Sequence, residues 1–316
     1  MKRRWLLAAL PWSAGCAVLS PTPQLDALER AVPPGVPSRV ELDAVPFFPQ
    51  TPFHCGPAAL ATVLVHAGFS GATPEGLADQ VFLPSREGAL QVEMLAAARR
   101  AGAVPVALPG DLGTLFGELG AGVPLIVLQN LGLAIAPRWH YAVLVGYDLP
   151  RREVVLRSGT TRREVMAMSL FERTWARGGH WVIAALPPGH WPASVREVDA
   201  VQAALGFERA VVDPAQRLKV YDSLVARWHD SLPALIGLGT ASAGVSDWPR
   251  AAAAFERAAR VHDSAAAWHN LALARWELGQ RDAARDAAQR AHARAQAAEP
   301  TWRDETQRLV ERLRKR

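Results

Sequence analysis

The sequence has 316 residues, and half of them are hydrophobic, which is enough to bury a large core and predicts two domains. The formal net charge is +5, but three of the positive charges lie at residues 2–4, and no basic stripe interleaved with aromatic residues follows, so we expect no nucleic-acid partner. The nine histidines show no metal-ligand spacing, and no glycine-rich loop carries a lysine. We therefore expect no metal, nucleotide or other cofactor.

Residues 1–16 are similar to a lipoprotein-type signal peptide. A basic start precedes an apolar region, residues 5–15, that is too short to span a bilayer. Residues 13–16, SAGC, resemble a lipoprotein cleavage box that would make Cys16 the lipidated first residue, although Ser13 stands where leucine is usual. We expect an exported protein, anchored through this lipid to a bacterial membrane and facing the periplasm. Simple secretory cleavage, which would give a secreted or periplasmic protein, is the alternative.

Residues 17–39 are rich in proline and show no sustained period. They predict a tether between the anchor and the first domain, with a short helix over residues 25–31.

The first domain is predicted over residues 40–188, and the stretch around Cys55 predicts a helix that begins at this cysteine. Pro57 suits a first helical turn, where its missing N–H is not needed. Apolar residues then follow helical spacing as far as Ala67, and Gly68 ends the run. The N–H groups and dipole at a helix N-terminus favour thiolate over thiol. We therefore predict that Cys55 is a nucleophile; the alternative is a small buried hydrophobic side chain.

The number of cysteines agrees with a reactive thiol. There are two, and if Cys16 carries a lipid, Cys55 has no intramolecular disulfide partner. An exported protein that keeps an unpaired thiol in an oxidising compartment indicates a function for it.

Helices are expected next over residues 73–81, where Thr73 caps a helix that opens with Pro74, and over residues 90–101, which end at Gly102. Short segments rich in β-branched residues follow, with turn residues between them, and predict strands over residues 104–108, 123–129, 140–147, 153–157 and 180–186. Helices followed by a run of strands indicate an α+β domain.

His140 begins the most apolar of these strands. At the end of a central strand its imidazole could face Cys55 across a cleft, take the thiol proton and return it to a leaving amine. The alternative is a histidine with a purely structural role at a strand end. His54 is a poorer base because it adjoins Cys55, and His180 is the reserve candidate.

These residues carry a resemblance. Gln50, Cys55-Gly56-Pro57 and the His140-Tyr141 strand resemble the papain-like bacteriocin-processing (double-glycine) cysteine peptidase family over residues 40–188. The resemblance implies a papain-like fold, with Cys55 as nucleophile and His140 as base. It also implies that Gln50 and the Cys55 N–H form the oxyanion hole, in which an amide beside a helix N-terminus stabilises the tetrahedral oxyanion.

The third catalytic position departs from this family. Its usual Asp or Asn is replaced here by Ser158, whose hydroxyl could accept the ring N–H of His140 but brings no charge. Asp148 is the other candidate, although its setting is typical of a turn. The sequence leaves the two open.

Residues 189–316 turn rich in alanine and arginine and contain an internal repeat. Leu238, Ala251, Phe255 and Ala258 recur 33 residues later as Leu271, Ala284, Ala288 and Ala291. This resembles the tetratricopeptide repeat, a helix–turn–helix unit that implies a groove for a protein or peptide partner. A degenerate hairpin over residues 196–229 and a polar capping helix over residues 301–316 complete the predicted stack; generic bundle packing is the alternative.

Two functions are consistent with these patterns. The first is an envelope-anchored cysteine peptidase that hydrolyses peptide bonds through Cys55 and His140, with repeats that recruit a protein or peptide substrate. The second is a catalytically weak papain-like domain that acts with its repeats as a binding scaffold; Ser158 favours this alternative.

Overall fold

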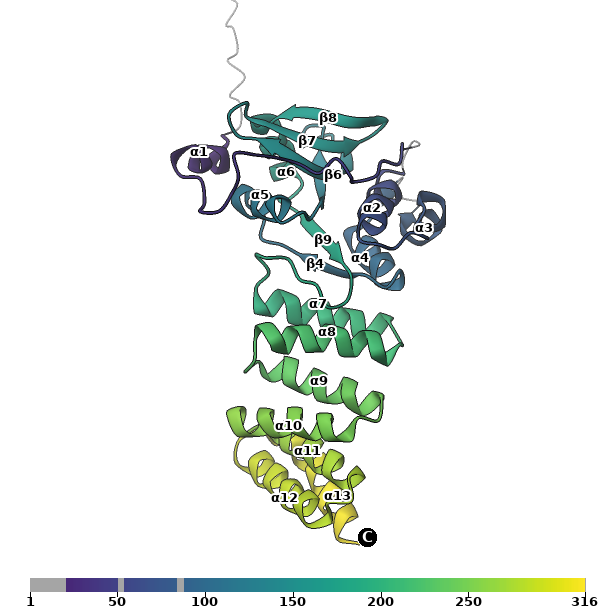
Figure 1. The fold of residues 1–316 in the computed structure, drawn as a ribbon, viewed down its shortest axis with the longest axis vertical. Helices are drawn as coiled ribbons and strands as arrows, with labels where there is room; N and C mark the ends of the chain where they lie inside the picture. Colours follow the sequence, from purple (N-terminus) through teal and green to yellow (C-terminus); the bar gives the residue numbers. More distant parts are fainter. Residues whose placement is uncertain (1–20, 51–53, 84–87, 316) are drawn as a thin grey trace, which may run out of the picture.

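The computed structural model describes residues 21–50, 54–83 and 88–315. The predicted signal peptide and the lipidation site at Cys16 lie outside the described residues. The molecule is elongated: a sheet with its covering helices forms one end, and further helices continue in a column to the C-terminus (Figure 1). The predicted order, an α+β domain followed by an all-α domain of helical hairpins, is confirmed.

Seven strands form one antiparallel sheet in the order β4-β9-β5-β6-β7-β8, with β1 paired to the far end of β6. A separate hairpin consists of β2 and β3. The strands are β1 Arg39–Glu41, β2 Phe82–Leu83, β3 Gly88–Ala89, β4 Val104–Ala107, β5 Leu125–Asn130, β6 Trp139–Asp148, β7 Glu153–Ser158, β8 Thr161–Ala167 and β9 Val182–Leu186.

Helices cover both faces of this sheet (Figure 1). Along β6, Tyr141, Val143 and Val145 pack into the core beneath α2, whereas Ala142 and Leu144 pack into the core on the opposite face. This two-sided burial explains why the strand is almost continuously apolar. The helices of this part are α1 Pro23–Arg30, α2 Cys55–His66, α3 Pro74–Val81, α4 Gln91–Arg100, α5 Leu112–Gly120 and α6 Met168–Arg177.

Helix α2 begins at Cys55, as predicted, and every residue from Gly56 to Leu64 is buried. Burial on all sides requires small residues where the helix meets its neighbours. A Cβ atom on Gly56 would lie 2.7 Å from the Cβ of Ala89. Glycine at this position therefore lets the first turn of α2 pack tightly against β3.

Helices α5 and α6 were not predicted, and neither were the strands β1, β2, β3 and β8. Helix α5 begins after Asp111, whose side chain accepts a hydrogen bond from the Thr114 N–H, and α6 covers the face of the sheet opposite α2.

The segment predicted to be a tether also differs from expectation. Leu25 and Leu28 of α1 are buried in the main core, and the carboxylate of Glu172 accepts hydrogen bonds from the first N–H groups of this helix. Residues 23–30 therefore belong to the folded body.

The C-terminal part contains the predicted helical hairpins. All eight repeat positions singled out in the sequence are buried, because small side chains allow the paired helices to approach closely. The helices are α7 Glu197–Ala210, α8 Pro214–Arg227, α9 Leu232–Gly244, α10 Trp248–His262, α11 Ala265–Glu277, α12 Arg281–Ala297, the short 3₁₀ helix η2 Pro300–Trp302 and α13 Arg303–Arg314. Within the described part of the chain, no helix has the length and apolarity needed to cross a membrane.

The two parts share a continuous core. Phe207 of α7 and Tyr221 of α8 belong to the same buried cluster as Phe116 and Phe171 of the sheet-containing part. The buried carboxylate of Glu118 accepts hydrogen bonds from two N–H groups of the connecting segment, at 3.1 and 2.6 Å. The domain boundary between residues 188 and 189 stays a prediction.

Replacing Gly239 with alanine should destabilise the helical part. The added Cβ would lie 2.4 Å from the Phe255 ring across the α9–α10 contact, and overpacking of this kind costs about 1–3 kcal/mol. Gly117→Ala in α5 is the matched control, because a Cβ there meets nothing within 4 Å and alanine is the better helix former. Urea unfolding followed by circular dichroism should show a lower free energy of unfolding for the first variant only. Equal stability of the two variants would contradict the close α9–α10 packing.

Candidate active site

A cleft of about 1070 Å³ opens at the N-terminus of α2. Its walls come from segments far apart in the chain: Gln50 and Cys55, the β3–α4 junction, the ends of β5 and β6, the turn after β7, and the C-terminus of α6. The structure therefore brings Gln50, Cys55 and His140 together in one cleft. Ser158 lies directly behind His140.

Cys55 is half-buried at the first position of α2. Burial raises the pKa of the Cys55 thiol above its ordinary value of 9.0, although the backbone N–H groups of Tyr141, Gly56 and Cys55 itself act in the opposite direction. The expectation of a lowered thiol pKa is therefore wrong in its net direction. The N–H groups at the helix N-terminus do stabilise the thiolate, but the loss of hydration on burial destabilises it more. Only the helix N-terminus could be inferred from the sequence.

His140 is held by Ser158. The ring Nε2 lies 2.9 Å from the Ser158 hydroxyl oxygen, which is itself buried. With the proton on Nε2, the ring donates to this hydroxyl, and Nδ1 is left as an acceptor. Burial lowers the pKa of His140 below 6.5; the carboxylate of Glu164 on β8 opposes this shift, and Arg138 reinforces it. Both shifts favour a neutral thiol beside a neutral imidazole.

The other candidates lie elsewhere. Asp148 occupies the opposite end of β6, eight residues from His140, a distance of roughly 27 Å at the rise of an extended strand. It forms an ion pair with Arg39 and caps a turn by accepting the Arg151 N–H. His180 packs edge-on against the Trp175 ring outside the cleft lining. Of the two residues left open for the third position, only Ser158 contacts His140.

Gln50 reaches the cleft from the segment before α2. Its backbone N–H donates to the Gly159 carbonyl oxygen at 3.0 Å, which fixes it beside the β7–β8 turn. The φ of Gly159 is +57°, and glycine adopts such a conformation readily. The side-chain amide of Gln50 donates to the Tyr141 carbonyl oxygen at 3.5 Å, a long bond that is easily exchanged for a better acceptor.

Sequence reasoning missed most of the cleft walls. Leu90 and Trp139 are apolar side chains that remain 39% and 57% exposed at the cleft. A Cβ on Gly178 would lie 2.0 Å from the Leu128 carbonyl oxygen, so only glycine fits there, where the end of α6 meets β5. The sequence did contain one signal of this wall, because Trp139 directly precedes the candidate base His140.

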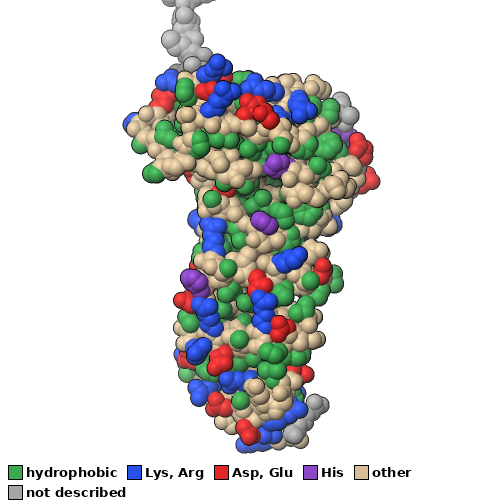
Figure 2. Space-filling model, viewed as in Figure 1, with side chains coloured by type: hydrophobic (Ala, Val, Ile, Leu, Met, Phe, Trp, Pro, Cys, Tyr) green, Lys and Arg blue, Asp and Glu red, His purple; other side chains and the backbone are tan. Residues whose placement is uncertain are grey.

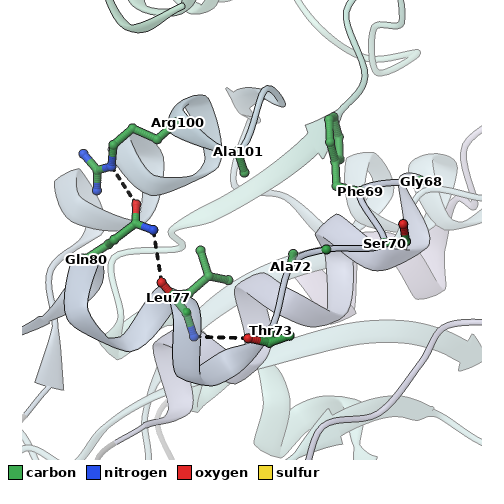
Figure 3. Close-up of a pocket in the computed structure, with 11 residues that line it drawn as sticks. Gly68, Phe69, Ser70, Ala72, Thr73, Leu77, Gln80, Arg100 and Ala101 are labelled. Atoms are coloured by element: carbon green, nitrogen blue, oxygen red, sulfur yellow. Dashed lines mark hydrogen bonds between the residues drawn. The ribbon is translucent and has the colours of Figure 1, made fainter.

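A second cavity, about 460 Å³, lies between the α2–α3 loop and α4 (Figure 3). The polar groups drawn there bond to one another: Arg100 donates to Gln80, Gln80 donates to the Gly76 carbonyl oxygen, and the Gly76 N–H donates to Thr73. The described lining of this cavity contains no cysteine, histidine, aspartate or glutamate, so it is a weaker candidate than the Cys55 cleft.

The surface charge is mixed. On the face shown in Figure 2, basic and acidic side chains alternate over the helical part and do not gather in a single patch. The described ranges contain no group of three or more histidine, cysteine, aspartate or glutamate side chains that could hold a metal ion.

Neither a protein-family model nor a curated protein matches the sequence. Among solved structures, the chain is similar to a C39-like peptidase from Bacillus anthracis, at 20% identity over 48% of this chain and 98% of that one, with a TM-score of 0.40. It is similar to the peptidase domain of Streptococcus ComA, a bifunctional ABC transporter involved in quorum sensing, at 22% identity over 45% and 98% of the two chains, with a TM-score of 0.37. A third similarity is to a thermophilic TPR protein of Thermus thermophilus, at 17% identity over 36% and 62%, with a TM-score of 0.30.

Proposed function

We propose that the chain is a cysteine peptidase that hydrolyses peptide bonds through Cys55, with His140 as general base. The observation that carries this proposal is the single cleft in which a cysteine at a helix N-terminus, a half-buried histidine and a glutamine amide converge. A nucleophile, a base held by a second residue and an oxyanion donor are the parts that acyl transfer requires.

The proposed reaction runs through an acyl-enzyme. Nδ1 of His140 takes the thiol proton as the Cys55 sulfur attacks the carbonyl carbon, and the oxyanion is stabilised by the Cys55 N–H and the Gln50 amide. His140 then delivers the proton to the amine nitrogen as the C–N bond breaks. A water molecule, deprotonated by His140, hydrolyses the thioester, and the proton returns to sulfur. Ser158 acts as a positioning residue for the ring.

The repeats and the predicted lipid extend this proposal. Stacked helical hairpins form grooves that hold extended or helical peptides, so the repeats would recruit a protein or peptide. A lipid on Cys16 would hold the peptidase at the bacterial envelope, facing the periplasm; mass spectrometry of the N-terminal peptide tests this assignment.

The decisive test is cleavage of a peptide library read by mass spectrometry. The protein from Ala17 onward, in which Cys55 is the only thiol, should release products and form a transient thioester, and Cys55→Ser should do neither. A second candidate function, a binding scaffold, is favoured by the uncharged Ser158 behind His140. Peptides that bind but are never cleaved would support the scaffold.

The pH profile should report a neutral catalytic pair. Protonation of His140 removes the base, so kcat/KM should fall as pH drops through a pKa that burial places below 6.5. Loss of the thiol proton leaves none for the leaving amine, so kcat/KM should also fall as pH rises through the Cys55 pKa, above 9.0. We expect a plateau between these values. If iodoacetamide still alkylates Cys55 at about pH 5, and this reaction is lost in His140→Ala, the resting pair is instead a Cys55 thiolate with a His140 imidazolium.

A further inference from the structure

Among the described residues, the charged side chains that line the Cys55 cleft are all basic. Among the described residues that form its walls, Arg138 and Arg177 carry permanent positive charges, His140 is the only other titratable base, and no aspartate or glutamate lines the cleft. Glu164 influences His140 from β8 but is not part of the lining. The described part of the cleft lining therefore carries only positive charge.

The two arginines reach the cleft from different elements. Arg138 immediately precedes β6, is exposed, and lies two residues from His140. Arg177 ends α6 and is half-buried; its Nε and Nη2 groups both donate to the Asn130 carbonyl oxygen, at 3.2 and 2.9 Å. This bond to a neutral carbonyl fixes the guanidinium at the cleft wall without neutralising its charge.

Fixed cations in a concave site favour a substrate that carries the opposite charge. A guanidinium whose orientation is already set loses little conformational entropy when it binds a carboxylate, and the planar fork matches carboxylate geometry. The neighbouring Trp139 and Leu90 provide apolar contacts for the residues that flank such a group.

We propose that Arg138 and Arg177 select peptides that present a carboxylate to the cleft, so that the preferred substrate of this peptidase is an acidic peptide. The proposal rests on the peptidase function for cleavage, but the selection itself is a property of binding. The carboxylate can come from an aspartate or glutamate side chain or from a peptide C-terminus, and the two sources present the same chemistry to the arginines.

Binding to the protein from Ala17 onward that carries Cys55→Ala tests the selection without catalysis. The probes are fluorescent peptides in matched sets, one with glutamate, one with glutamine at the same position, and one with the C-terminus amidated. We expect the glutamate peptide to bind about 2–5-fold more tightly than its glutamine counterpart, with the difference reduced by salt. If the glutamate and glutamine peptides instead bind alike and amidation weakens binding, the C-terminal carboxylate is the group that is bound.

Charge reversal supplies the second arm. Arg138→Glu is exposed and should fold normally, and it should remove most of the preference for the glutamate peptide, because Arg177 is then offset by a new carboxylate. Arg100→Glu, at an exposed arginine outside this cleft, should leave the preference unchanged. The proposal would be overturned if the protein without a charge reversal bound the glutamate, glutamine and amidated peptides equally tightly. Selective binding without cleavage by the Cys55-containing protein would overturn the peptidase function and leave the selection standing.

Discussion

Replacing His140 with alanine should lower kcat/KM for any cleaved peptide by about 10²–10⁴-fold, the usual contribution of a positioned general base. Burial keeps the Cys55 thiol protonated at neutral pH, so the reaction depends on a base at the moment of attack. An enzyme with a preformed thiolate would lose less in the nucleophilic step. The loss should fall mainly on kcat, because the ring transfers the proton, whereas the other residues that line the cleft are unchanged by the substitution.

The matched control is His180→Asn. His180 has a φ of +54°, a conformation that asparagine tolerates, and its ring packs on Trp175 outside the cleft lining. This variant should retain full activity. The assignment of the base would be wrong if His180→Asn abolished cleavage while His140→Ala preserved it.

The sequence predicted the elements that carry the candidate site, because their signals are local. The helix at Cys55 is visible from a proline in its first turn, helical apolar spacing and a terminal Gly68, and each of these acts within a few residues. The strand at His140 is visible as a run of buried apolar side chains. Helix α5 carries the same kind of signal, with Leu112, Leu115 and Leu119 following the Asp111 cap, and was available to the same reasoning.

The properties that depend on tertiary packing were not accessible in this way. The protonation of Cys55 is decided by how far α2 is buried against the sheet, and the chain around the cysteine shows only the N–H groups that act in the other direction. The contact between Ser158 and His140 depends on the register between β6 and β7, which the sequence does not show. The distance of Asp148 from His140, by contrast, follows from the predicted strand that holds both residues. The basic cleft required Arg138 and Arg177 to converge from separate elements.

Replacing Gln50 with alanine should reduce kcat by about 10²–10³-fold with little change in KM, as expected for loss of one oxyanion donor. Among the described residues, the amide is held by the 3.5 Å bond to the Tyr141 carbonyl oxygen, so it is available to a developing oxyanion but gains little from a neutral ground-state carbonyl. Steady-state kinetics on the best peptide from the library would measure the division between kcat and KM.

Gln50→Glu separates the chemistry of this residue from its shape. The carboxylate fills the same space and can still be anchored by the backbone bond to Gly159, but it donates no hydrogen bond when ionised and repels the oxyanion. Its kcat should therefore be as low as that of Gln50→Ala or lower, while Gln80→Ala, a change at an exposed glutamine on α3, should behave like the parent. Full activity of Gln50→Glu would exclude the amide as a donor. The backbone N–H of Cys55 would then stabilise the oxyanion, because the described cleft lining contains no other residue that the resemblance assigns to this role.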